Sequence, residues 1–104
     1  MTSVHDRIKE LVESNKIVIF MKGTPQMPMC GFSAATVEAL KTLGQPFQAV
    51  NVLADPAIRE GIKLYSSWPT IPQVFIGGQF VGGCDIVREL AASGELARLV
   101  AAAK

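Results

Sequence analysis

The first apolar pattern along the chain has the spacing of an amphipathic helix. Val4, Ile8 and Leu11 are three or four residues apart, so they share one face of a helix. Ser3 stands immediately before them, and a serine in that position accepts a hydrogen bond from a free N–H of the first turn. We therefore expect a helix that begins after Ser3 and ends at residues 14–15.

Four shorter segments have the composition of strands. Ile17–Phe20 is a continuous run of β-branched and aromatic residues, which is typical of a strand buried on both faces. Phe47–Val52 is a second candidate strand. Gln73–Ile76 and Gln79–Val81 flank Gly77–Gly78, a pair that favours the tight turn of a β-hairpin.

The remaining helical patterns are marked by residues typical of helix ends. One helix begins after Cys30 and ends at Gly44, and another begins at Asp55–Pro56, an N-cap followed by proline at the first helical position. Asp85 is expected to cap a helix that runs to Ser93, and a short helix follows. The apolar faces of these helices are formed by Val37, Leu40, Leu43, Ile58, Ile62, Tyr65, Leu96, Leu99 and Val100.

The predicted order of elements is α-β-α-β-α-β-β-α-α. A helix separates the first two strands, so these should pair in parallel through a right-handed crossover, whereas the last two form an antiparallel hairpin. This predicts an α/β fold with a four-stranded mixed sheet flanked by helices on both faces. Cys30 would then lie just beyond the carboxyl end of the first strand, where open α/β sheets bind ligands.

Composition narrows the class of protein. Of 104 residues, 49% are hydrophobic and 18% charged, which is typical of a globular chain, and we expect a single domain over residues 1–104. A net charge of +1 gives no reason to expect nucleic acid or an anionic membrane as partner, and no apolar run reaches the ~18 residues of a membrane span. No secretory signal pattern is present, and two widely separated cysteines suit a reducing compartment, so a cytoplasmic location is expected.

The most informative side chain is Cys30, at the start of the second predicted helix. N–H groups at a helix N-terminus favour thiolate over thiol, and a thiolate is both a nucleophile and a metal ligand. Ser33 stands where thioredoxin-like oxidoreductases have a second cysteine. Because serine cannot resolve a mixed disulfide, Cys30 must work with a thiol from elsewhere. A buried structural cysteine is the alternative, but the preceding loop of residues 22–29 contains two prolines and is expected at the surface.

A second candidate feature is the Ile71–Pro72 bond, which precedes the third strand and could be a cis peptide. In that conformation the backbone N–H and C=O of Ile71 would be free to bind an extended peptide in the manner of a strand. A rigid turn before an edge strand is the other interpretation, and the sequence supports the two equally.

Gly82–Asp85 and three basic residues suggest what such a peptide would carry. The glycines allow close backbone approach, and the following helix N-terminus attracts an anion. Asp85 is commonly an N-cap, but it could also bind an ammonium group while nearby amides bind a carboxylate, as an α-amino acid head requires. Lys22, Arg59 and Lys63 are individually expected to be solvated charges, but together they could bind a second carboxylate. A peptide with these groups matches glutathione.

These motifs occur together and in register. They are Lys22-Gly23-Thr24, Cys30-Gly31-Phe32-Ser33, Trp68-Pro69-Thr70-Ile71-Pro72-Gln73 and Gly82-Gly83-Cys84-Asp85. The chain thereby resembles monothiol glutaredoxins of the CGFS type over residues 4–100. The resemblance implies a thioredoxin-like fold, glutathione binding and carriage of a [2Fe–2S] cluster. It implies that Cys30 is the reactive thiol and the cluster ligand. It also implies that a glutathione carboxylate, or the Cys30 site itself, is contacted by Lys22, Arg59 and Lys63. The rest of glutathione would be bound by the backbone of Ile71 and by Cys84 and Asp85.

Stoichiometry favours a shared cluster. A [2Fe–2S] cluster held by thiolates needs four of them, and each chain offers one well-placed cysteine. Two chains and two glutathiones complete the set, which predicts a homodimer when the cluster is bound. A BolA-like protein and iron–sulfur client or scaffold proteins are the further partners that the resemblance implies. The alternative is a glutathione-dependent thiol–disulfide oxidoreductase, at most a weak enzyme, in which Cys30 removes glutathione from mixed disulfides.

Other conspicuous side chains have ordinary expectations. Trp68 and Phe32 could flank the site, but packing is the expected role of both. Met27 and Met29 are expected to fill gaps in their loop or to contact a partner. His5 has no companion at a metal-binding spacing, and we expect it to be solvated.

Overall fold

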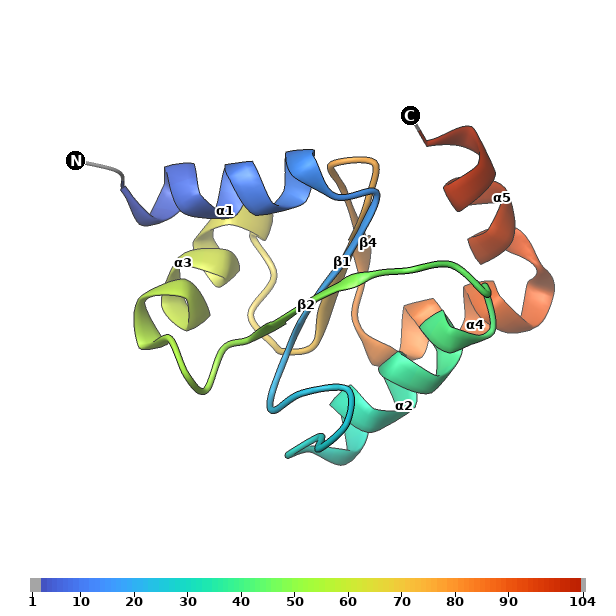
Figure 1. Ribbon diagram of the computed structural model, residues 1–104, viewed down its shortest axis with the longest axis horizontal. Coiled ribbons are helices and arrows are strands. Elements are labelled where there is room, and N and C mark those ends of the chain that lie inside the picture. The colour runs from blue at the N-terminus through green and yellow to red at the C-terminus, as the bar shows by residue number, and fades with distance from the viewer. Residues whose placement is uncertain (1–2, 104) are drawn as a thin grey trace.

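The computed structural model describes residues 3–103, which form five helices and four strands (Figure 1). In chain order the elements are α1 (Val4–Ser14), β1 (Ile17–Met21), α2 (Gly31–Lys41), β2 (Gln48–Asn51), α3 (Pro56–Ser66), β3 (Gln73–Ile76), β4 (Gln79–Gly82), α4 (Cys84–Ser93) and α5 (Glu95–Ala102). This order of helices and strands is the one predicted from the sequence.

The strands form one mixed sheet in the order β2-β1-β3-β4. β1 and β2 are parallel, with Ile19 opposite Ala49, and β3 is antiparallel to both β1 and β4. Gly77 and Gly78 form the turn between β3 and β4 with φ angles of 60° and 79°, a region that glycine adopts without steric cost. The predicted parallel first pair and the C-terminal hairpin are therefore confirmed.

Each face of the sheet has its own hydrophobic core. α1 and α3 cover one face, and α2, α4 and α5 cover the other (Figure 1). Successive side chains of β1 point to opposite faces, so Ile17, Ile19 and Met21 pack in the core of α2, α4 and α5, whereas Val18 and Phe20 pack in the core of α1 and α3. This alternation explains why the sequence of β1 is apolar without interruption.

Two of the three predicted N-caps are confirmed. Ser3 Oγ and Asp55 Oδ1 each accept a hydrogen bond from the backbone N–H three residues later, at 3.0 Å and 3.2 Å. The prediction that Asp85 caps α4 is wrong, because α4 begins at Cys84 with Gly83 as its N-cap, and Asp85 lies in the first turn. Glycine is an acceptable N-cap but carries no side-chain signal, so the sequence pointed to the aspartate instead.

Smaller differences concern the ends of elements. α2 ends at Lys41, and Gly44 closes the turn that follows by donating its N–H to the Lys41 carbonyl at 3.2 Å. β2 is shorter than the predicted Phe47–Val52, because only residues 48–51 pair with β1. Leu99, expected on the inner face of α5, is 40% exposed. None of the helices within residues 3–103 is long and apolar enough to cross a membrane.

Candidate functional site

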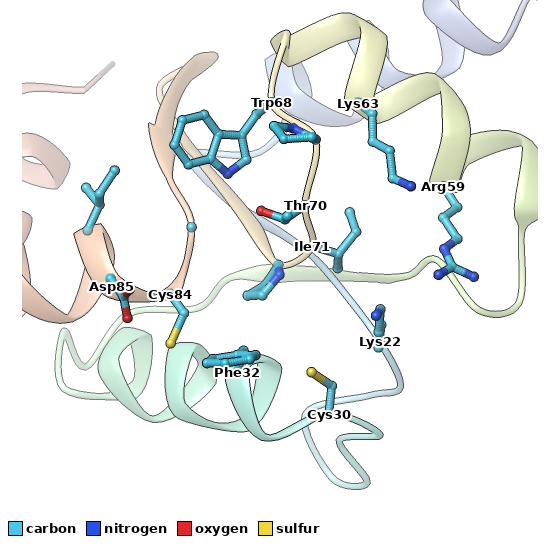
Figure 2. Close-up of a pocket in the computed structure, with 14 residues that line it drawn as sticks. Lys22, Cys30, Phe32, Arg59, Lys63, Trp68, Thr70, Ile71, Cys84 and Asp85 are labelled. Carbon is cyan, nitrogen blue, oxygen red and sulfur yellow. The ribbon is translucent and has the colours of Figure 1, made fainter.

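A pocket of about 540 Å³ lies where the two helical layers meet beyond the ends of β1 and β3 (Figure 2). Its walls come from the start of α2, one side of α3, the segment before β3 and the start of α4. The pocket brings together all the residues that the sequence proposed for a site, namely Lys22, Cys30, Arg59, Lys63, Ile71, Cys84 and Asp85. The seven residues therefore line one pocket, and what each of them binds is a prediction.

Cys30 is the N-cap residue of α2 and is half-buried at the edge of this pocket. The backbone N–H of Ser33 is the main cause that lowers the pKa of the Cys30 thiol, and burial opposes it. The N–H of Phe32 and the positive charge of Lys22 lower this pKa further. The Cys30 thiol therefore loses its proton more readily than an ordinary cysteine does, as expected at a helix N-terminus.

The loop that leads to Cys30 is fixed by side chains whose roles the sequence did not reveal. Ser33 is fully buried, and its Oγ accepts the backbone N–H of Lys22 at 3.1 Å. The N–H of Gly23 donates to Asn51 Oδ1, at the end of β2, at 2.9 Å. The serine that replaces a second cysteine thus has a structural role of its own, which is to hold the backbone of Lys22 beside the start of α2.

Lys22, Arg59 and Lys63 form the basic side of the pocket (Figure 2). Arg59 and Lys63 are four residues apart on α3 and therefore lie on the same face of that helix. Arg59 Nε is buried and has no hydrogen-bond partner within residues 3–103. Lys63 Nζ lies 3.2 Å from Glu60 Oε2, so part of its charge is already compensated. Of the two cations on α3, Arg59 is the better placed to bind an anion.

The segment before β3 forms the wall between α3 and α4. The Ile71–Pro72 bond is cis, which is one of the two interpretations that the sequence supported equally. The other interpretation placed a rigid turn before an edge strand, but β3 lies between β1 and β4. Within the described part of the chain, neither the N–H nor the C=O of Ile71 has a hydrogen-bond partner. The fully buried amide of Gln73 donates from Nε2 to the carbonyls of Trp68 and Thr70, at 2.9 Å and 3.1 Å. A free backbone N–H and C=O beside a pocket are suited to pairing with an extended peptide.

The start of α4 faces this wall. Cys84 is only 8% exposed, whereas Asp85 is exposed. A Cβ on Gly83 would lie 3.3 Å from the Pro72 carbonyl oxygen and 3.5 Å from Trp68 Nε1, so glycine permits the close approach that the sequence predicted for this motif. Figure 2 shows Cys84 and Asp85 on the side of the pocket opposite the basic residues.

Some side chains near the pocket are placed differently from expectation. Phe32 is 63% exposed and lines the pocket, so its expected packing role is wrong. Trp68 packs against Phe80, with ring centroids 5.6 Å apart, and also lines the pocket. Met27 and Met29 are 69% and 62% exposed. The two methionines therefore do not fill gaps, and contact with a partner remains the expectation for them.

The site contains chemical groups that are suited to binding a peptide. No group of three or more His, Cys, Asp and Glu side chains in residues 3–103 is arranged to hold a metal ion. Cys30 and Cys84 are both free thiols. The basic side fits a carboxylate, the Ile71 backbone fits a peptide unit, and the α4 side offers one acidic side chain. A cysteine of lowered pKa beside a peptide-sized pocket, at the end of the first strand of this sheet, is the arrangement of a thioredoxin-like thiol protein.

Comparison with known proteins makes this class specific. A family model described as Glutaredoxin matches residues 17–81. An uncharacterized monothiol glutaredoxin of Synechocystis sp. is 56% identical over 94 residues, which cover 90% of this chain and 88% of the relative. The chloroplastic monothiol glutaredoxin-S14 of Arabidopsis thaliana is 54% identical over 91 residues, and here the match covers 88% of this chain but only 53% of the relative. The chain belongs to the glutaredoxin family, among the monothiol glutaredoxins.

Solved structures agree in fold. The solution structure of reduced apo GrxS14 from poplar has a TM-score of 0.80 and 50% sequence identity, and the match covers 91% of this chain and 87% of that one. The crystal structure of a buckwheat glutaredoxin–glutathione complex has a TM-score of 0.83 and 29% identity, and it covers 94% of this chain and 87% of the other. The thioredoxin-like fold predicted from the sequence is therefore confirmed.

Proposed function

We propose that the protein binds glutathione and carries a [2Fe–2S] cluster between two copies of itself. The cluster is its cargo, held by Cys30 of each copy and by the thiols of two glutathione molecules. The observation that carries this proposal is a cysteine of lowered pKa beside a peptide-sized pocket, in residues 3–103 where no three or more His, Cys, Asp and Glu side chains are grouped to hold a metal ion. A thiolate-held cluster needs four ligands, so a single chain has to recruit the other three.

The pocket supports glutathione as the source of the added thiols. Glutathione has a carboxylate at each end, an amine at one end and two peptide bonds between them. The basic side of the pocket suits the carboxylate at one end, and Asp85 with the N-terminus of α4 suits the amino-acid head at the other. Pairing with the Ile71 backbone would then direct the central cysteine of glutathione towards Cys30. A solved glutaredoxin of the same fold is described as a glutathione complex.

The surface around Cys30 supports approach of a second protein. Met27, Met29 and Phe32 are each more than 60% exposed and lie within three residues of Cys30 in the sequence. Large apolar side chains are enriched in the centres of protein interfaces. We assign them to contact with the second copy, or with a BolA-like protein and iron–sulfur client or scaffold proteins that replace it. We propose that the protein carries the cluster in a reducing compartment, and the cytoplasm is the compartment that we expect.

Anaerobic reconstitution tests the proposal. Reduced protein is incubated with iron, sulfide and glutathione, and then examined by visible absorption, by size-exclusion chromatography and by assays for iron, sulfide and bound glutathione. We expect two irons, two sulfides and two glutathiones per dimer, and a return to monomer when the cluster is removed. A coloured monomer, or a cluster that forms equally well without glutathione, would contradict the assigned ligand set.

The lowered pKa of Cys30 favours a second candidate, removal of glutathione from mixed disulfides. The Cys30 thiolate would attack the glutathione sulfur and release the target thiolate. A second glutathione thiolate would then attack the resulting Cys30–glutathione disulfide, releasing oxidised glutathione and regenerating Cys30. Steady-state kinetics on a glutathionylated substrate decide between the candidates: turnover comparable to that of a dithiol glutaredoxin favours the enzyme, and slow or absent turnover favours the carrier.

A further inference from the structure

Gln73, the first residue of β3, is a polar side chain with no exposed surface. Its Nε2 donates to two carbonyls of the preceding segment, while its Oε1 is buried and has no partner within residues 3–103. A buried amide with an unpaired oxygen opposes folding. An apolar side chain of similar size would fill the same space without that penalty. The presence of an amide here therefore suggests a purpose other than core stability.

Segment 68–71, which is the middle of the connection between α3 and β3, depends on this amide. The N–H of Trp68 donates to the Lys63 carbonyl at 3.2 Å and to Ser66 Oγ at 3.1 Å, which fixes the beginning of the segment. Beyond that point, the carbonyls of residues 68–71 accept hydrogen bonds from no described group other than Gln73. The same segment forms a wall of the pocket, with Thr70 and Ile71 facing it (Figure 2).

We propose that Gln73 is a positioning residue for ligand binding. Its amide holds the Trp68 and Thr70 carbonyls, and thereby keeps the Ile71 backbone in the conformation that can pair with a peptide. The assignment rests on the proposed binding of glutathione in this pocket. Gln73 does not itself touch the ligand, because it has no exposed surface.

Replacement of the amide by an apolar side chain of similar length isolates this role. In Gln73→Met the segment loses both hydrogen bonds, so its binding-competent conformation is populated only part of the time. If that population falls to about one tenth, the apparent dissociation constant of glutathione rises about tenfold. The melting temperature of Gln73→Met should stay close to that of the unmodified protein even though its affinity for glutathione is lower. The reason is that the substitution also removes the unpaired Oε1 from the core. The freed carbonyls can be hydrated, since Thr70 is exposed and Trp68 is only partly buried.

The experiment uses the reduced full chain and two readouts. Trp68 is the only tryptophan of the chain, so its fluorescence emission and anisotropy report on the segment without any ligand. Calorimetric titration with glutathione reports on affinity. Gln79→Met is the matched control, because Gln79 is exposed on β4 and does not line the pocket. We expect a mobile, more solvated Trp68 and a roughly tenfold weaker affinity in Gln73→Met, with neither change in Gln79→Met.

A second variant adds a pH dependence of glutathione affinity, which a residue that only fills space would not produce. Gln73→Glu has almost the same shape, and burial raises the pKa of a carboxyl group. When protonated, the new side chain can donate one hydrogen bond to the segment; when ionised, it can donate none and repels both carbonyls. The glutathione affinity of Gln73→Glu, taken relative to the unmodified protein at each pH, should therefore recover as the pH is lowered.

The outcomes separate this proposal from the one on which it rests. If the unmodified protein does not bind glutathione, the proposed function fails, while Trp68 mobility still tests whether Gln73 holds the segment. Unchanged Trp68 emission together with unchanged affinity in Gln73→Met would overturn the positioning role. Loss of folding in both Gln73→Met and Gln73→Glu would also overturn it, since Gln73 would then be a residue of the core.

Discussion

Arg59→Ala tests the assignment of the basic side of the pocket most directly. Within residues 3–103 the guanidinium of Arg59 forms no ion pair, and its Nε is buried without a hydrogen-bond partner. The group is therefore already desolvated in part and is not committed to another residue. A hydrogen bond to a charged group contributes about 1.5–3 kcal/mol. We therefore expect Arg59→Ala to raise the dissociation constant of glutathione roughly 10- to 150-fold.

Lys63→Ala should cost less than Arg59→Ala, because Lys63 already lies 3.2 Å from Glu60. A ligand carboxylate would have to compete with that exposed ion pair, so we expect a loss of affinity of less than about tenfold. Neither substitution should change the melting temperature much, since alanine is a good helix former and the backbone N–H of Arg59 still bonds the Asp55 carbonyl at 3.0 Å.

Calorimetric titration of reduced protein with glutathione measures both effects. Arg88→Ala is the control, because Arg88 is an exposed arginine on α4 that does not line the pocket. The difference between Arg59→Ala and the unmodified protein should shrink as salt is added, as expected for an interaction between charges. An affinity for glutathione that is the same in Arg59→Ala and in Arg88→Ala would refute the reasoning and remove Arg59 from the site.

Three further predictions concern Cys30, Cys84 and the ion pair between Arg7 of α1 and Asp55, the N-cap of α3. Cys30→Ala should abolish cluster binding while Ser33→Ala retains it, because only Cys30 combines a thiol with a helix N-terminus; visible absorption after reconstitution decides this. Reduced Cys84→Ser, with excess glutathione, should keep the cluster, because we assign the backbone rather than the sulfur of Cys84 to glutathione binding, and colourless protein would contradict this. The side chain of Arg7 lowers the pKa of Asp55, so this pair stabilises the fold above the ordinary aspartate pKa of 3.8, and the stabilisation is lost as the pH falls through the lower folded value. Asp55→Asn keeps a capping oxygen but no charge, so its unfolding free energy, measured from neutral to acidic pH, should decline less than that of the unmodified protein.

The sequence predicts the sheet well because its signals there are local. Ile17–Phe20 could be interpreted as a strand buried on both faces because every position is apolar. Gly77–Gly78 indicated the hairpin because few other residue pairs adopt that turn. The end of β2 was harder to predict, since it depends on which residues pair with β1 and not on composition. β2 is an edge strand, so its length is set by the number of residues that pair with β1, its one neighbour in the sheet.

The sequence predicted which residues line the pocket better than it predicted the contacts that hold them in place. Cys30, Arg59 and Ile71 were identified from motifs and from charge, and they do lie around one pocket. Gln73 belongs to one of the motifs, but its buried role was not identified, because a polar residue at the start of a strand is usually expected to face solvent. Asn51 was missed for a related reason: its side chain bonds Gly23, which is 28 residues away in the sequence. Contacts of this kind depend on the folded chain and leave no periodic pattern.

The position of the pocket between the two helical layers has a mechanical consequence. Arg59 and Lys63 belong to the layer of α1 and α3, whereas Cys30, Cys84 and Asp85 belong to the layer of α2, α4 and α5. A ligand that contacts both sets would act as a non-covalent cross-link between layers that lie on opposite faces of the sheet. Its binding free energy would then be added to the work of separating the layers. Without such a ligand, each layer can open more independently of the other.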